Sequence, residues 1–171
     1  MRIHAAFLFC VTLSCPLGAS ADQSPEVAFS PSPRAIELVE RTIKQAKQSI
    51  QVAAYSFTSY DIADALIEAQ RRGVDVRVLL DKGQGKRHYK VIDSMRGAGI
   101  GIRINRHYAI MHNKYIITDG KTVETGSFNY TANANLHNAE NVIVINDNEM
   151  LANEYMENWQ KLWSEGEEYP Q

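Results

Sequence analysis

Cysteine is almost absent from this sequence. The 171 residues include only two, Cys10 and Cys15, and both lie near the N-terminus. A chain that loses this segment keeps no thiol, which excludes disulfide bonds and cysteine-ligated metals. Its stability must then come from a buried core or from a partner subunit.

Long apolar runs are also scarce. The run from Ala5 to Leu13 is too short to span a bilayer as a permanent helix. It follows the basic Arg2 and precedes the small residues Ala19-Ser20-Ala21, a pattern typical of a secretory signal peptide. We therefore expect residues 1–21 to be a signal peptide and the mature protein to be exported, to the periplasm or beyond. A lipid anchor at Cys15 is a lesser alternative, and we expect no integral membrane segment in the mature chain.

The sequence lacks the excess of basic residues that coats many nucleic-acid-binding proteins, since its formal net charge is −2. The charges are unevenly distributed, however. Residues 82–121 contain nine Lys or Arg and two Asp, whereas residues 140–171 contain eight Asp or Glu and one Lys. This pattern suits either an ordinary solvated surface or a positive field over a polyanion site, with an acidic helix facing away. We favour the second, because the basic block contains the motif described below.

Short apolar segments alternate with segments of helical spacing along the chain. Strands are predicted at 49–57, 74–80, 100–104, 114–118, 123–125 and 141–145, and helices at 34–46, 59–72, 83–99, 131–136 and from 147 onward. Asp119-Gly120 is a hairpin turn signal, so the sheet is expected to be mixed. The sequence thus predicts an α/β fold, a mixed β-sheet flanked by helices on both faces. Residues 22–33 form an extended N-terminal segment and residues 34–168 a single domain.

Six residues suited to phosphate chemistry are concentrated in one short stretch: His112, Lys114, Asp119, Gly126, Ser127 and Asn129. A histidine nitrogen can attack phosphorus and hold it covalently, and a lysine can stabilise the oxygens. His112 and Lys114 would point to the same side of a strand, because side chains alternate. Gly126 and Ser127 form a turn where the backbone can approach a ligand closely, and Asn129 adds a neutral donor. Asp119 suits the hairpin turn better than catalysis.

These residues match the HxKx4Dx6GSxN signature at every fixed position, so the chain is identified as resembling the phospholipase D superfamily. The resemblance implies that His112 is the nucleophile and that Lys114 and Asn129 bind phosphate oxygens. It further implies that Ser127 and Glu140 support and orient the imidazole. His88, His107 and His137 lack such partners and are interpreted as surface or turn residues.

Most members of that superfamily carry two copies of the motif, and this chain has one. A two-fold homodimer would supply the second, with one His112 attacking and the other protonating the leaving oxygen. Two Lys114 side chains would stabilise the transition state without a metal, and no acidic cluster near the motif offers a two-metal site. We therefore expect a metal-independent, homodimeric phosphodiesterase that needs no cofactor.

The resemblance is greatest to small, exported, single-motif bacterial endonucleases. It implies sequence-nonspecific cleavage of DNA, with RNA also open, and products with 5′-phosphate ends. The basic block at 82–121 is consistent with phosphate-dominated binding. The alternatives are a phospholipase D or cardiolipin-type lipid hydrolase, which would need an apolar interfacial surface, and a catalytically silent nucleic-acid-binding module.

Overall fold

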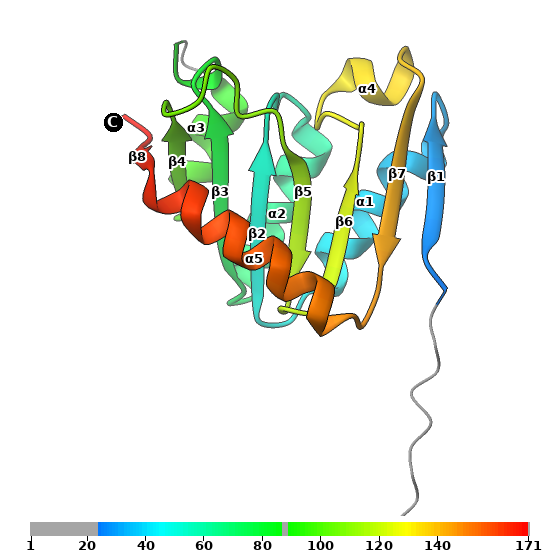
Figure 1. The fold of residues 1–171 in the computed structure, drawn as a ribbon. Helices are drawn as coiled ribbons and strands as arrows, with labels where there is room; N and C mark the ends of the chain where they lie inside the picture. The colour runs from blue at the N-terminus through cyan, green and yellow to red at the C-terminus, as the bar shows by residue number, and fades with distance from the viewer. Residues whose placement is uncertain (1–23, 87–88, 171) are drawn as a thin grey trace, which may run out of the picture.

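A computed structural model describes residues 24–86 and 89–170, so the predicted signal peptide and His88 lie outside the described residues. The described chain forms one mixed sheet of eight strands in the order β1-β7-β6-β5-β2-β3-β4-β8 (Figure 1). The strands are β1 (Glu26–Ser30), β2 (Ser49–Ala54), β3 (Asp75–Asp81), β4 (Gly101–Asn105), β5 (Lys114–Thr118), β6 (Thr122–Gly126), β7 (Glu140–Ile145) and β8 (Gly166–Glu168). Strands β2, β3 and β4 are parallel, and every other pair is antiparallel. The predicted mixed sheet is confirmed.

Helices cover both faces of this sheet, as predicted. They are α1 (Pro33–Gln45), α2 (Tyr60–Arg71), α3 (Lys90–Gly97), α4 (Ala132–Leu136) and α5 (Glu149–Ser164). Helices α1, α2 and α3 lie on one face, whereas α5 crosses the other face obliquely (Figure 1). The main core lies between the sheet and α1–α3, and smaller apolar clusters lie under α5.

Local sequence signals explain where several elements begin and end. Helix α1 begins at Pro33 after Ser32, whose hydroxyl accepts the amide of Arg34 as an N-cap. Asp119 and Gly120 have φ of 53° and 65° and close the β5–β6 hairpin, as the turn signal predicts. The aromatic stripe of α5 packs as core, since Trp159 is buried and its indole donates to the carbonyl of Val52.

Two segments differ from the sequence prediction. The helix expected over 83–99 is divided into a short 3-10 turn, Gln84–Lys86, and α3. Gly83 and Gly85 disfavour a continuous helix there. The extended N-terminal segment contains a strand, β1, because residues 26–30 pair in antiparallel register with β7 at the edge of the sheet.

Candidate active site

All the motif residues except Asp119 lie at a single edge of the sheet. Strands β2, β3 and β4 end at this edge, β5 begins there immediately after His112, β6 ends there at Gly126, and β7 begins there at Glu140 (Figure 1). The antiparallel register of β5, β6 and β7 therefore brings together residues up to 28 positions apart in sequence. Open α/β sheets bind ligands at this edge, outside the carboxyl ends of their parallel strands.

His112 is exposed at this edge and its ring lies against Tyr55. The two ring centroids are 4.4 Å apart and the planes are inclined by 58°. Tyr55 follows β2, and its amide donates to the carbonyl of Asn113 at 3.0 Å. On the other side, the buried carboxylate of Asp81 accepts the amide of Met111 at 2.8 Å. The backbone on both sides of His112 is thus fixed by residues from β2 and β3.

Lys114 is the first residue of β5 and is 8% exposed. Its ammonium donates to the carbonyl of His112 at 2.7 Å and lies 5.1 Å from the centre of the Tyr55 ring. Burial lowers the pKa of Lys114, and the negative charge of Glu140 opposes this effect. A partly desolvated cation beside an exposed imidazole is the arrangement that phosphate binding requires.

Ser127 and Glu140 lie together where β6 ends and β7 begins. The Ser127 hydroxyl donates to a Glu140 carboxylate oxygen at 2.5 Å and accepts the amide of Asn141 at 3.1 Å. Within the described residues, neither side chain forms a hydrogen bond with the His112 ring. Ser127 and Glu140 therefore bind each other, whereas the predicted role of both in orienting the imidazole stays a prediction.

Gly126 allows the close approach of β6 to β7 that places Ser127. It has φ of 153°, and a β-carbon at this position would lie 2.1 Å from the carbonyl oxygen of Asn141. The amide of Ser127 donates to that same oxygen at 3.1 Å. Only glycine fits here, because β6 lies so close to β7, whereas the predicted close approach of this backbone to a ligand stays a prediction.

Asn129 follows Ser127 in the same turn and is half-buried. Its side-chain oxygen is buried, and no donor among the described residues reaches it. A buried polar atom without a partner is costly, so it points to a ligand-binding or otherwise functional position. The Asn129 side chain follows the end of β6, at the edge that His112 and Lys114 occupy.

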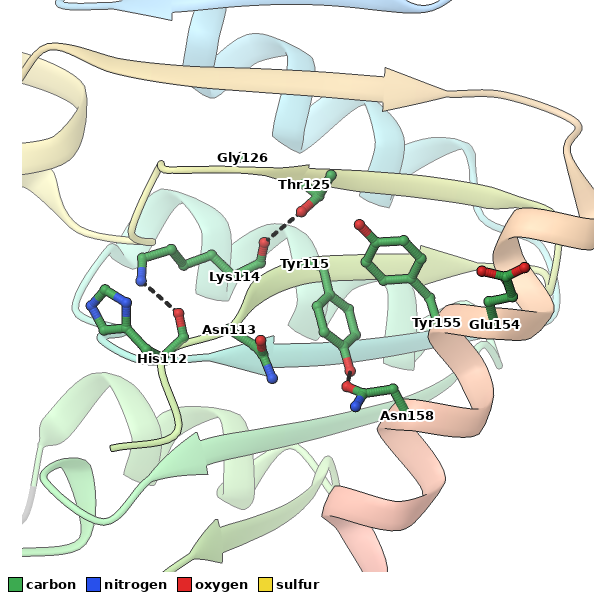
Figure 2. Close-up of a pocket in the computed structure, with 9 residues that line it drawn as sticks. All are labelled: His112, Asn113, Lys114, Tyr115, Thr125, Gly126, Glu154, Tyr155 and Asn158. Carbon is green, nitrogen blue, oxygen red and sulfur yellow. Dashed lines mark hydrogen bonds between the residues drawn. The ribbon is translucent and has the colours of Figure 1, made fainter. Parts of the chain in front are cut away.

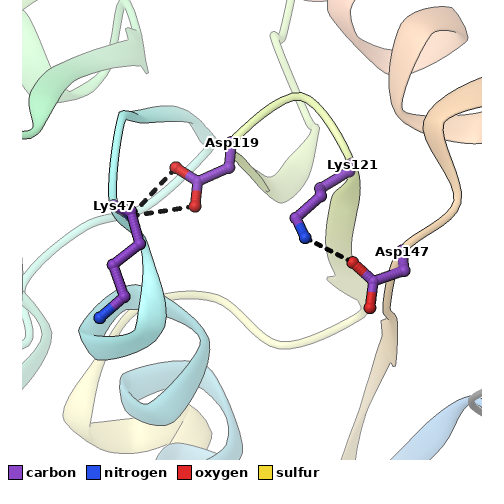
Figure 3. A network of polar contacts seen from close by, with 4 residues as sticks. All are labelled: Lys47, Asp119, Lys121 and Asp147. Carbon is purple, nitrogen blue, oxygen red and sulfur yellow. Dashed lines mark hydrogen bonds and ion pairs between the residues drawn. The ribbon is translucent and has the colours of Figure 1, made fainter.

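Asp119 lies at the opposite end of β5 and has a structural role, as its turn position predicts. Its carboxylate accepts the amides of Lys47, Gln48 and Ser49 at 2.9, 2.7 and 3.0 Å. Partial burial tends to raise the pKa of Asp119, but these bonds and the charge of Lys121 hold it below its ordinary value. Figure 3 shows this contact beside the ion pair of Lys121 with Asp147. Asp119 therefore joins the β5–β6 hairpin to the start of β2.

A cavity of about 430 Å³ extends from His112 and Lys114 along β5 and β6 to α5. Figure 2 shows His112 and Lys114 at one end and Glu154, Tyr155 and Asn158 of α5 at the other. The acidic C-terminal helix therefore does not face away from the site, as we expected from the charge distribution. It lines the site because α5 packs across β5 and β6 on that face of the sheet.

A buried carboxyl group behind the site was missed by the sequence analysis. Glu124, in the middle of β6, is 1% exposed and accepts the hydroxyl of the fully buried Tyr130 at 2.7 Å. Burial raises the pKa of Glu124 to about 8, an effect that the Tyr130 bond partly offsets. The backbone carbonyl of Tyr130 accepts the amides of Thr58 and Ser59. The signal available in the sequence was the position of Glu124 in the middle of the strand predicted over 123–125.

The other histidines in the described chain lie where the sequence analysis placed them. His107 and His137 are exposed, the first in the turn after β4 and the second at the C-terminal end of α4.

No group of three or more His, Cys, Asp or Glu in the described residues is arranged to hold a metal ion. No helix in that part of the chain has the length and apolar character needed to cross a membrane.

Comparison with known proteins identifies the family. Residues 39–163 match the family described as cardiolipin synthase, PLD-like domain. The chain belongs to the phospholipase D superfamily. Members of this superfamily are hydrolases acting on phosphodiester bonds, and the resemblance seen in the motif is thus confirmed.

Individual relatives show how far the likeness extends. A phospholipase D family member, Nuc from Salmonella typhimurium, is 39% identical, with a TM-score of 0.80 over 86% of this chain and 99% of Nuc. A protein named phospholipase D from Rickettsia felis is 44% identical over 77% of this chain and 65% of its own length. The mitochondrial cardiolipin hydrolase of Chlamydomonas reinhardtii is 33% identical over 79% of this chain and 60% of its own length. This chain therefore spans somewhat less than two thirds of these last two relatives.

Proposed function

We propose that this protein is a metal-independent phosphodiesterase that cleaves DNA without sequence preference and acts as a homodimer. The observation that carries the proposal is the arrangement at the sheet edge. The exposed imidazole of His112 lies beside the partly desolvated ammonium of Lys114, and the side chain of Asn129, whose oxygen has no partner among the described residues, lies at the same edge. These groups supply a nucleophile, a cation and a neutral donor for one phosphate.

The reaction proceeds in two displacements. A neutral His112 nitrogen attacks phosphorus, the bond from phosphorus to the 3′ oxygen breaks, and a protonated second histidine gives that oxygen its proton. A phosphohistidine remains, still esterified to the 5′ oxygen. Water then attacks phosphorus and the second histidine takes the proton from this water. The bond from phosphorus to the His112 nitrogen breaks, and the product leaves with a 5′-phosphate. Lys114 and Asn129 bind the non-bridging oxygens throughout.

The second histidine comes from a second copy of the chain. Of the other described histidines, His137 is exposed at the C-terminal end of α4 and His107 is exposed in the turn after β4, where its ring packs against Tyr108, so neither belongs to a second copy of the motif. Within one chain, Ser127 and Glu140 pair with each other and not with His112. We propose that this pair orients the attacking imidazole once two copies are joined.

Several observations favour a nucleic acid as substrate. The cavity beside His112 is lined by polar groups such as Asn113, Glu154 and Asn158, which do not suit acyl chains. Lys82 and Arg106 follow β3 and β4 at the edge that carries His112. RNA remains a second substrate of the same chemistry.

Residues 1–21 lie outside the described structure, and we propose that they export the protein to the periplasm.

A lipid substrate is the alternative, favoured by the names phospholipase D and cardiolipin hydrolase among the relatives. The test compares supercoiled plasmid with cardiolipin liposomes in the presence of chelator. Wild type and His112→Ala are each sized before the assay. We expect the wild-type dimer to nick plasmid, to leave liposomes intact and to be inactivated by His112→Ala. Hydrolysis of liposomes without plasmid nicking would establish the lipid alternative, and DNA binding without cleavage would establish a silent binding module.

A further inference from the structure

A buried hydrogen bond closes the turn that carries Ser127 and Asn129. The hydroxyl of Tyr130 donates to a carboxyl oxygen of Glu124 at 2.7 Å, and these two residues are 0% and 1% exposed. The turn between them joins the end of β6 to α4 at the edge of the sheet that carries His112 (Figure 1). The reaction steps described above use neither Glu124 nor Tyr130.

Tyr130 is fixed by three separate contacts. Its hydroxyl binds Glu124, and its ring packs against the ring of Phe57 with the centroids 5.9 Å apart. Its backbone carbonyl accepts the amides of Thr58 and Ser59 at 2.9 and 3.0 Å. Ser59 is the N-cap of α2. The bond between Tyr130 and Glu124 therefore joins β6 to the start of α2 through one buried side chain.

Side chains alternate along this turn between the core and the site. Phe128 and Tyr130 belong to the main core, whereas Ser127 is exposed and Asn129 is half-buried. The turn is fixed at its beginning by the amide of Ser127, which donates to the carbonyl of Asn141 at 3.1 Å. It is fixed at its end by Tyr130. Because Asn129 directly precedes Tyr130, a displacement of Tyr130 also displaces Asn129.

We propose that Glu124 and Tyr130 are positioning residues for the phosphodiesterase reaction, and that their buried hydrogen bond fixes where the Asn129 side chain meets the phosphate. Both act through the turn, without contact to the substrate. A displacement of about 1 Å at a group that binds the transition state can slow a reaction about 100-fold. This inference rests on the proposed function, in which Asn129 binds the non-bridging oxygens.

The first test removes the hydrogen bond and keeps the packing. Tyr130→Phe retains the ring against Phe57 and loses the hydroxyl. Glu124→Gln retains a side-chain carbonyl that can accept this hydroxyl. Because burial raises the pKa of Glu124 to about 8, glutamine replaces a largely neutral carboxyl group of similar shape at neutral pH.

Steady-state kinetics of DNA cleavage in chelator gives kcat and KM separately. We expect Tyr130→Phe to lower kcat by about tenfold to 100-fold, and Glu124→Gln to retain the wild-type kcat. KM should change little in both variants, because phosphate contacts elsewhere along the DNA dominate its affinity. A wild-type kcat in Tyr130→Phe would overturn the inference.

Thr42→Val is the matched control, because it also removes one buried hydroxyl. Thr42 is 4% exposed on α1, and its hydroxyl donates to the carbonyl of Leu38 at 2.9 Å. It lines a cavity beside Asp119, at the opposite edge of the sheet from His112. Circular dichroism checks the folding of each variant, and urea unfolding measures the stability that each one loses. We expect kcat to fall in Tyr130→Phe and to stay unchanged in Thr42→Val.

The second test separates position from stability. In the double variant Glu124→Leu/Tyr130→Phe, two apolar side chains replace the hydrogen-bonded pair, and such a replacement can leave stability nearly unchanged. We expect the urea midpoint of the double variant to lie above that of Tyr130→Phe, because no buried carboxyl group is left without its donor. Its kcat should stay as low as that of Tyr130→Phe. Recovery of kcat together with stability would show a purely structural role and would overturn the inference.

Hydrogen exchange tests the geometry without an activity assay. The amides of Thr58 and Ser59, which the Tyr130 carbonyl accepts, should exchange faster in Tyr130→Phe than in wild type or Thr42→Val. Unchanged exchange at both amides would overturn the inference. A wild type that cleaves no DNA would contradict the proposed function, and the exchange result would still decide whether the buried pair fixes the turn.

Discussion

The ring of Tyr55 lies against the imidazole of His112, with the centroids 4.4 Å apart. Lys114 places its ammonium 5.1 Å from the centre of the same ring. Tyr55 thus contacts both the proposed nucleophile and the proposed phosphate-binding cation, although it lies 57 positions before His112. It is a positioning residue for both.

Replacing Tyr55 tests this role. Tyr55→Ala should lower kcat by about threefold to tenfold, because an aromatic pair contributes about 0.5–1.5 kcal/mol. Tyr55→Phe keeps the ring and should retain wild-type kcat. Steady-state kinetics on a defined oligonucleotide provides the measurement. Equal losses in both variants would assign the effect to the hydroxyl instead of the ring.

Gly126 should tolerate no side chain. The β-carbon of Gly126→Ala would lie 2.1 Å from the carbonyl oxygen of Asn141, so β6 and β7 must separate. We expect a loss of about 1–3 kcal/mol in the free energy of unfolding, as for other overpacked sites. Gly97→Ala is the control: no atom lies within 4 Å of its added carbon, and it should stabilise α3 by about 0.5–1 kcal/mol. Urea unfolding measures the free energy of unfolding of both variants. An unchanged value for Gly126→Ala would contradict the clash.

Asp119 should contribute to stability and not to catalysis. Asp119→Ala leaves the amides of Lys47, Gln48 and Ser49 without their acceptor. Asp147→Ala is a close control, because Asp119 and Asp147 have φ of 53° and 50° and Asp147 makes one exposed ion pair. We expect Asp119→Ala to lower the free energy of unfolding by about 1–3 kcal/mol more than Asp147→Ala does.

The pH dependence of this difference has a defined sign. The pKa of Asp119 in the folded protein lies below its ordinary value of 3.8. Its contribution to the free energy of unfolding is therefore present above pH 3.8 and is lost on acidification. The kcat of the folded protein should be unchanged in both variants. A selective loss of kcat in Asp119→Ala would assign it a catalytic role.

Glu124 should make the protein less stable as the pH rises. Its pKa is raised from 4.5 to about 8, so between these values the folded state keeps a proton that the unfolded state releases. Stability relative to Glu124→Gln should therefore be greatest below pH 4.5 and fall by about 1.4 kcal/mol per pH unit up to about pH 8. Urea unfolding of both proteins across this range provides the measurement. If the difference in free energy of unfolding between wild type and Glu124→Gln were the same at every pH, Glu124 would already be ionised in the folded state.

The sequence predicts the parts of this account that depend on local pattern. The alternation of strands and helices, the turn at Asp119-Gly120 and the mixed sheet are all confirmed. Of the motif residues, His112, Lys114, Gly126, Ser127 and Asn129 lie at one sheet edge and Asp119 lies at the other end of β5, and their predicted catalytic roles stay predictions. Short-range periodicity and turn chemistry determine these features, and both are visible in a single sequence.

The remaining features depend on pairing between distant segments. Tyr55 reaches His112 because β2 pairs with β5, and the Asp81 carboxylate reaches Met111 because β3 ends beside that loop. The position of α5 against the site follows from oblique packing, which amphipathic spacing does not specify. The uneven distribution of charge along the sequence therefore led to the wrong prediction that the acidic helix faces away from the site.

The stereochemical course at phosphorus tests the central claim most directly. A phosphorothioate diester of known configuration is cleaved by the wild type in isotopically labelled water, with chelator present. Two in-line displacements through a phosphohistidine on His112 invert the configuration twice, so the account predicts overall retention. Overall inversion would show that water attacks phosphorus directly, and would contradict a covalent role for His112.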